Sequence, residues 1–278
     1  MFHSFHTRDR AGKSVKSTKK SSYREAMKFK LQQKMDSHKP LPVSDTMLNS
    51  PIVTLTVGHD QRLFAAHETV LSASSFFSVA LKTQFFETAA KRLDLPDEDP
   101  IIFSCVLEYL YKGDYYPRLL HNKRKDSWEL EDAQDTQNLG GRGSCEATFT
   151  PAYGSGDGLL LKDTAVYCLA DKFGLPELKR LALRKQGLQS GISVDVILRS
   201  ARYAYAHTPE TDSKLRAHYL ALIIRSRKTF KRSGTMQMEM EKGGSSLFFD
   251  LFVAMCNHVD DISDLKSVRG SPRSVHTT

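Results

Sequence analysis

The chain has 278 residues, enough for one large domain or two modest ones with substantial apolar cores. No run approaches the roughly eighteen apolar residues that a membrane-spanning helix needs, and the N-terminus lacks the apolar segment of a secretory signal. The four cysteines are far apart and form no C-x-x-C pair, so we expect reduced thiols in an intracellular protein and no zinc site; they are Cys105, Cys145, Cys168 and Cys256.

The net charge of +8 comes from the N-terminal tail. Residues 1–40 hold eleven Lys or Arg and three Asp or Glu, which accounts for the whole excess. Because the rest of the chain is balanced, the folded body is not expected to carry the basic patch of a nucleic-acid-binding domain. Residues 1–48 are polar and basic, and we expect them to form a disordered tail.

The role of this tail stays open. Tyr23, Met27, Leu31 and Met35 recur at intervals of four residues, which fits either a marginal surface helix or a helix that docks on the body or on a partner. The basic residues could bind nucleic acid or an anionic surface weakly, act as a nuclear import signal, or only keep the chain soluble. Such binding would be non-specific and would weaken steeply with salt.

A strand, a turn and a second strand open the body. Residues 52–57 are mostly β-branched, residues 58–61 are typical of a turn, and residues 62–65 read as a second short strand, so a hairpin is predicted. The residues that follow His67 form a broken helical stripe, with Ser72, Ser74 and Ser75 available as caps. His67 is therefore expected where the second strand gives way to a helix.

A third strand and a longer helix come next. Residues 92–95 predict a short strand, and the acidic turn at residues 96–100 suits the positive N-terminus of a helix. That helix has Ile102, Val106, Tyr109 and Leu110 on one face, and Gly113 is expected as its C-cap.

The rest of the chain divides into a loop and a helical part. Residues 118–158 hold six of the sixteen glycines and predict an inserted, mobile loop. Helical patterns then run to about residue 262, interrupted at Gly174 and Pro176, with Pro209 placed for a first helical turn. Residues 263–278 are expected to be a disordered tail.

Several motifs together resemble the BTB/POZ family. They are Phe64-x-x-His67 with Val70-Leu71 and Phe76-Phe77, then Phe85-Phe86-Glu87, the strand RLDLP, and FSCVLEYLYKGDYY up to Tyr116. The segment AVYCLADKFGLPELKRLALRK, up to Lys185, is similar to the last helix pair of that fold, and the helices beyond it look like the C-terminal extension of fungal BTB-domain proteins.

This resemblance implies an α+β fold with a short sheet and paired helices. The BTB/POZ domain would span residues 49–186, interrupted by the loop at 118–158, and an all-α region would follow at 187–262. The fold signature that it implies is Phe64, His67, Leu71, Phe77, Tyr109, Leu110, Tyr111 and Gly113. His67 is then a structural residue, and backbone groups at the strand–helix junction are its expected hydrogen-bond partners.

The family also implies a function. BTB domains are protein–protein interaction modules that commonly self-associate, and many are substrate adaptors for cullin-type ubiquitin ligases through a hydrophobic-x-Glu triplet. Phe85 and Glu87 match that triplet, as an aromatic anchor and a carboxylate that binds the cullin. The alternative is that Phe85 belongs to the core and Glu87 is a solvated charge. The charged pocket of co-repressor BTB domains is not expected here, because its two charged positions fall at Ile52 and Ser74.

Catalysis is not expected. The sequence holds neither a G-x-S-x-G elbow nor an H-E-x-x-H motif, and no cofactor is implied. The leading hypothesis is an interaction module in the cytoplasm or nucleus, with a cullin as a candidate partner. The alternative is a non-enzymatic BTB scaffold or nuclear regulator whose basic tail binds nucleic acid or an anionic surface weakly.

Overall fold

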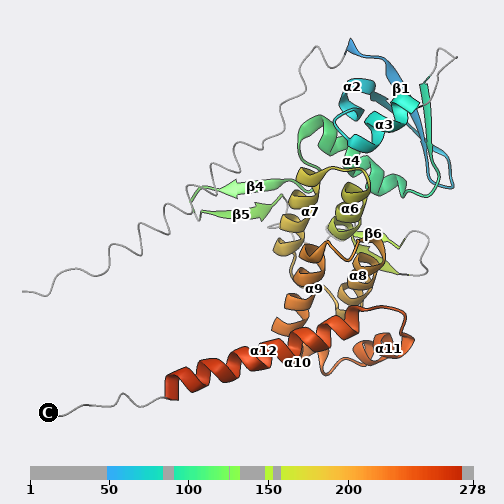
Figure 1. Ribbon diagram of the computed structural model, residues 1–278. Coiled ribbons are helices and arrows are strands. Elements are labelled where there is room, and N and C mark those ends of the chain that lie inside the picture. Colours follow the sequence, from blue (N-terminus) through green and yellow to red (C-terminus); the bar gives the residue numbers. More distant parts are fainter. Residues whose placement is uncertain (1–48, 84–90, 125, 132–147, 153–157, 271–278) are drawn as a thin grey trace, which may run out of the picture. The chain divides into compact units, whose positions relative to one another are not determined.

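The computed structural model describes residues 49–83, 91–124, 126–131, 148–152 and 158–270, with side chains up to residue 263. The basic tail, the final residues and the segment that contains Phe85 and Glu87 lie outside these ranges. Figure 1 gives the order of the elements. No helix in the described ranges is both long enough and apolar enough to span a membrane.

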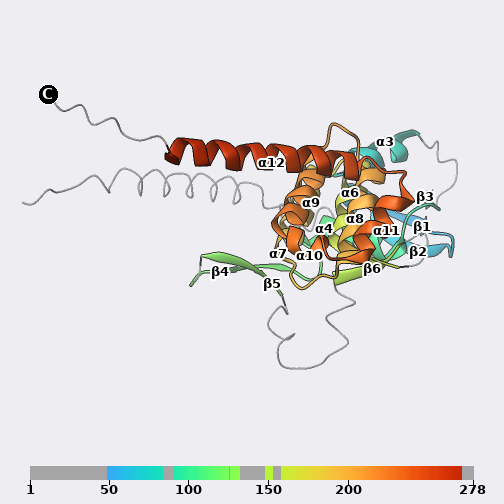
Figure 2. The same ribbon diagram turned by 90° about the horizontal axis from the view of Figure 1, so that it is seen from below.

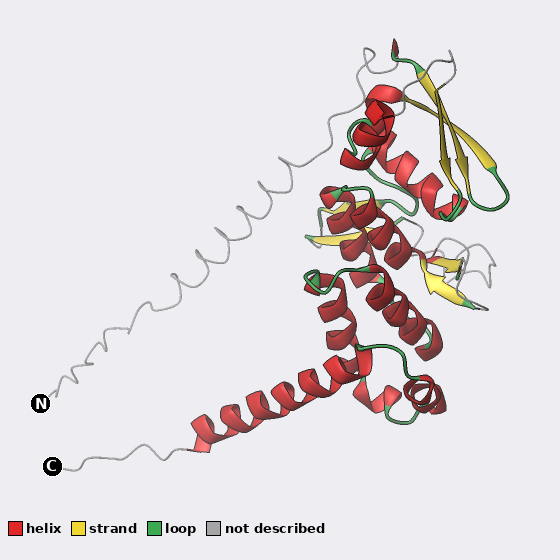
Figure 3. Ribbon diagram, turned by 45° about the vertical axis from the view of Figure 1, so that its right-hand side comes forward, coloured by secondary structure: helices red, strands yellow, loops and turns green. Residues whose placement is uncertain are grey.

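A three-stranded sheet forms the first layer. Strand β1 (Ile52–Val57) lies in the middle, antiparallel to β2 (Arg62–His67) and parallel to β3 (Lys91–Leu95). Alternate residues of β1 point to the core, where Val53, Leu55 and Val57 are fully buried. The predicted hairpin is confirmed, and Gly58 has the positive φ of 77° that its turn needs. Figure 3 shows the strands beside the helices that cover this buried face.

Three helices cover the sheet, namely α2 (Glu68–Leu71), α3 (Ser75–Thr83) and α4 (Pro100–Lys112). The predicted ends of α4 are confirmed. The Asp99 carboxylate accepts a hydrogen bond from the Ile101 N–H (2.7 Å), and Gly113 ends the helix with φ 74°. Of the serines predicted as caps, Ser74 caps the start of α3, because its hydroxyl accepts a hydrogen bond from the Phe77 N–H (3.3 Å). Ser72 is the C-cap of α2, and Ser75 is the first residue of α3.

The helical part begins with α6 (Lys162–Lys172) and α7 (Pro176–Leu188), which pack on each other, and α6 also packs on α4. Then come α8 (Val194–His207), α9 (Ser213–Arg225), α10 (Arg227–Phe230), α11 (Gly234–Lys242) and α12 (Leu247–Gly270). Two expectations differ from the structure. Pro209 precedes α9, which is capped by Asp212, and α12 continues past residue 262 into the expected tail.

The segment at 118–158 is not a single structureless loop. Strands β4 (Leu119–Asn122) and β5 (Ser127–Leu130) form a hairpin, and β6 (Phe149–Pro151) pairs with β7 (Leu159–Leu161). The hairpin has its own contacts, because the Trp128 ring lies 4.7 Å from His121 and 5.4 Å from the Arg184 guanidinium. The glycines that suggested a loop lie mostly in the undescribed residues 132–147 and 153–157.

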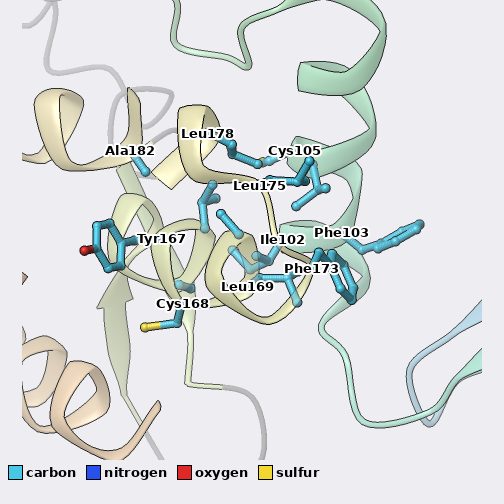
Figure 4. Close-up of a cluster of buried hydrophobic side chains, with 14 of the residues drawn as sticks. Ile102, Phe103, Cys105, Tyr167, Cys168, Leu169, Phe173, Leu175, Leu178 and Ala182 are labelled. Carbon is cyan, nitrogen blue, oxygen red and sulfur yellow. The ribbon is translucent and has the colours of Figure 1, made fainter. Parts of the chain in front are cut away.

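An aromatic cluster joins the sheet layer to the later helices. The rings of Phe77 from α3, Phe103 from α4 and Phe173 after α6 are fully buried, with centroids 4.8 to 6.3 Å apart. Figure 4 shows Phe103 and Phe173 together with Ile102 and Leu169 in this cluster. The core therefore continues from the sheet into the helical part without a break.

Gly174 makes the turn after this cluster possible, and its replacement gives a test. Its φ is +66°, and an added Cβ would lie 2.1 Å from the Ser75 Oγ. Gly174→Ala should lower the free energy of unfolding by about 1–2 kcal/mol, because a side chain in the left-handed region is strained. Gly187→Ala is the matched control, since no atom lies within 4 Å of its added Cβ in α7.

The control should leave stability unchanged or raise it by up to about 1 kcal/mol, the helix preference of alanine over glycine. Urea unfolding of the two variants measures the difference. Equal free energies for the two variants would contradict the role given to Gly174.

Candidate protein-interaction surfaces

The predicted fold signature lies inside the body rather than on its surface. Leu71 and Phe77 are fully buried and Tyr109 is nearly so. Phe64 and Leu110 are partly buried and pack on the core, with the Phe64 ring edge-on to Phe103 at 5.2 Å. These positions hold the sheet against α3 and α4 and offer no binding surface of their own.

His67 lies at the strand–helix junction, as predicted, where it is the N-cap residue of α2. Its partner differs from the prediction. The Tyr111 hydroxyl accepts a hydrogen bond from the His67 backbone N–H (2.9 Å) and lies 2.8 Å from Nδ1, to which it can donate. One side-chain hydroxyl therefore takes the place of the expected backbone partners and ties the junction to the last turn of α4. This geometry suits a structural histidine.

Phe85 and Glu87 fall in residues 84–90, outside the described part of the chain. The described elements on either side are α3, which ends at Thr83, and β3, which begins at Lys91. The last turns of α3 expose an apolar and a basic side chain, Val79 (62% exposed) and Lys82. In the sequence, the triplet thus comes directly after α3, a helix that exposes part of its surface to solvent.

The outer face of the sheet is the second exposed surface of this part. Ile52 and Leu63 are 61% and 63% exposed, which gives the face an apolar character. Ile52 is one of the two positions where a co-repressor BTB domain would carry a pocket charge. The other, Ser74, is fully buried, and its hydroxyl donates to the Phe173 carbonyl at 2.6 Å. Neither position can present a charge to a partner.

A buried polar cluster lies at the end of α4, and no pattern in the sequence predicts it. Lys185 of α7 is fully buried, and its ammonium donates to the backbone carbonyls of Tyr115 (2.5 Å) and Pro117 (2.8 Å). It also pairs with the Asp114 carboxylate and lies 3.6 Å from the centre of the Tyr115 ring. Burial lowers the pKa of Lys185, and the Asp114 carboxylate opposes that shift.

The cluster continues through the Tyr115 side chain. The Tyr115 hydroxyl donates to Asp163 of α6 (2.6 Å), whose other oxygen accepts from the Gln189 amide (3.1 Å). Burial raises the pKa of the Asp163 carboxyl and raises that of Tyr115 well above its usual value. A carboxylate and a lysine that lie together and have shifted pKa values can mark a catalytic site.

The geometry favours a structural role. An ammonium has three donors, and Asp114 and the two carbonyls occupy all three. The amine therefore has no free position with which to bind a substrate, and the cluster ties the connection after α4 to α6 and α7. In the sequence Lys185 looks like any helical lysine, because nothing in its spacing marks it as buried.

Replacing Lys185 tests this role. Lys185→Met should lower the free energy of unfolding by about 3 kcal/mol, because it leaves the partly exposed Asp114 carboxylate and the carbonyls of Tyr115 and Pro117 without their donor. Arg180→Met is the matched control on the same helix, where the exposed pair with Glu177 should contribute less than about 1 kcal/mol. Urea unfolding measures both. Adding Asp114→Asn should recover part of the loss, and equal effects at positions 180 and 185 would contradict the role of the cluster.

Comparison with known proteins completes the description. The described residues contain no group of three or more His, Cys, Asp or Glu side chains placed to hold a metal ion. The chain matches no curated protein. The model of the BTB/POZ domain family matches residues 49–125, the stretch that holds the three-stranded sheet and α2 to α4. The match ends before α6 and α7, which the resemblance had included. Residues 49–125 of this chain are therefore a BTB/POZ domain, a module of protein–protein interaction.

Proposed function

We propose that this protein is a BTB-type adaptor that brings a bound partner protein to a cullin-type ubiquitin ligase. The observation that carries the proposal is the BTB/POZ domain at residues 49–125, together with the triplet Phe85-Phe86-Glu87 after α3. In the family such a triplet binds the cullin. The exposed Val79 and Lys82 on the preceding helix are consistent with a contact surface there.

An adaptor needs two binding regions that are held in a defined relation. Here the first would be the BTB/POZ domain and the second the helices from α8 onward. Helices α6 and α7 join the two regions. Phe173, after α6, packs on Phe77 and Phe103, and Lys185 of α7 is buried against the connection that follows α4. Helix α6 in turn packs on α8. The fold therefore supports the transfer of a fixed orientation from one region to the other.

Phe85→Ala tests the cullin contact. If Phe85 is an exposed anchor, its truncation should cost about 2 kcal/mol or more of binding, roughly a thirtyfold loss of affinity, with an unchanged melting temperature. If Phe85 is part of the core, the substitution should instead cost about 3–5 kcal/mol of stability. Co-purification with a cullin and thermal unfolding of the same sample separate the two cases.

Glu87→Lys gives the second arm, because it reverses a charge-assisted contact. Glu210→Lys is its control, since Glu210 is exposed in the connection between α8 and α9. We expect cullin capture to fall for Glu87→Lys and to stay unchanged for Glu210→Lys. If the wild-type protein captures no cullin, the adaptor proposal is wrong and the BTB/POZ domain serves another interaction.

A further inference from the structure

The C-terminal helices enclose a pocket that the adaptor proposal does not use. It has a volume of about 950 Å³ and lies among the end of α9, α10, α11 and the first turns of α12. Its apolar lining contains three methionines, which are flexible and adapt to an inserted side chain. The apolar lining residues are Ile223, Phe230, Met236, Met240, Leu251 and Met255.

The rim of this pocket is basic. Arg227, Lys228, Lys231 and Arg232 all line it and are exposed, whereas Glu241 is the one carboxylate among the lining residues that the structure describes. Lys228, Lys231 and Arg232 form no ion pair with any residue in the described ranges. The pocket therefore combines an apolar floor with positive charge that is available to a partner.

Helix α12 presents a second, complementary surface. Phe249, Phe252, Val253, Cys256 and Val259 follow each other at helical spacing and form a stripe on the side away from the buried Leu247 and Leu251. The two phenylalanines are 70% and 66% exposed. In Figure 2 the first turns of α12 lie beside α9, and its later turns run past that helix. We name this surface the α12 stripe.

The charge of α12 is opposite to that of the pocket rim. From residue 247 to residue 263 the helix contains Asp250, Asp260 and Asp261 and no Lys or Arg. The Asp250 carboxylate accepts a hydrogen bond from the Tyr205 hydroxyl, whereas Asp260 and Asp261 are exposed near the end of the stripe. An acidic, apolar helix and a basic, apolar pocket are thus displayed by the same chain.

We propose that two copies of this chain form a dimer in which each α12 stripe covers the pocket of the other copy. A two-fold axis makes such contacts reciprocal, so each copy contributes one stripe and one pocket. Asp260 follows Val259 of the stripe, so a stripe that lies on the pocket brings this carboxylate toward the cations of the rim.

The size of the contact is adequate for an oligomer of modest affinity. A phenylalanine side chain buries roughly 150–250 Å² when it is covered completely. At their observed exposure, the four phenylalanines of two stripes would bury on the order of 500 Å². The valines, methionines and rim residues of both copies bring the total near the roughly 1,000 Å² expected of a specific interface. Nucleic acid would satisfy the cations but would leave the stripe exposed.

Sedimentation of the full-length protein over a range of concentrations tests the dimer. Met240→Glu places a charge in the pocket and should raise the dissociation constant at least about tenfold. Met238→Glu is the matched control on the same helix. Met238 (57% exposed) and Met240 (53% exposed) are similarly accessible, but only Met240 lines the pocket. We expect Met238→Glu to associate like the wild type.

Charge exchange makes the test specific. The double variant Lys228→Glu/Lys231→Glu should weaken association at low salt by about tenfold or more, and added Asp260→Lys/Asp261→Lys should restore it. The double variant Arg92→Glu/Lys214→Glu changes the net charge equally at exposed sites outside the pocket and should have no effect.

Three outcomes would overturn the proposal. The first is a wild-type protein that stays monomeric. The second is self-association that none of the pocket and stripe substitutions changes, because the dimer contact would then lie in the BTB/POZ domain. The third is a monomer that binds a DNA duplex and loses that binding in Lys228→Glu/Lys231→Glu, which would make the rim a nucleic-acid site. Cullin capture is measured separately on the same variants. Failure of the adaptor proposal can therefore be distinguished from failure of the dimer proposal.

Discussion

The buried ammonium of Lys185 is the contact on which the junction of the two parts depends. Removing a charge from water costs several kcal/mol even after relaxation, so such a group persists only where the fold supplies its partners. Here those partners come from the connection after α4, while the lysine comes from α7. Their distance in the sequence means that the cluster can form only when both parts are folded. The BTB/POZ domain and the helices after it are therefore coupled in stability.

The features that could be predicted from the sequence are those with a local cause. The alternation in β1, the Asp99 cap and the Gly113 C-cap follow from neighbouring residues, and all three are present. The partner of His67 could not be predicted in this way, because Tyr111 comes from another helix. Lys185 was missed for the same reason. Burial of a lysine is decided by acceptors far away in the chain, and spacing along α7 carries no sign of them.

Composition misled the prediction in two other places. The glycines between residues 138 and 158 suggested one long loop, although residues such as Trp128 have specific partners and form part of a hairpin. Polar residues after position 262 suggested the end of the fold, whereas α12 continues to Gly270. Of the candidate site, the triplet was recognised from its likeness to the family. The C-terminal pocket went unnoticed, because its lining comes from four helices whose packing no local pattern encodes.

The position of Phe173 and Lys185 also has a consequence for how this protein can be divided. The family match ends at residue 125, but both side chains lie beyond it and complete the core of the matched segment. A fragment that stops at the end of the match would expose Phe77 and Phe103 to water and leave Asp114 without its cation. Expression boundaries for the domain should accordingly be placed after α7. The segment that the family model matches is here shorter than the segment whose side chains complete its core.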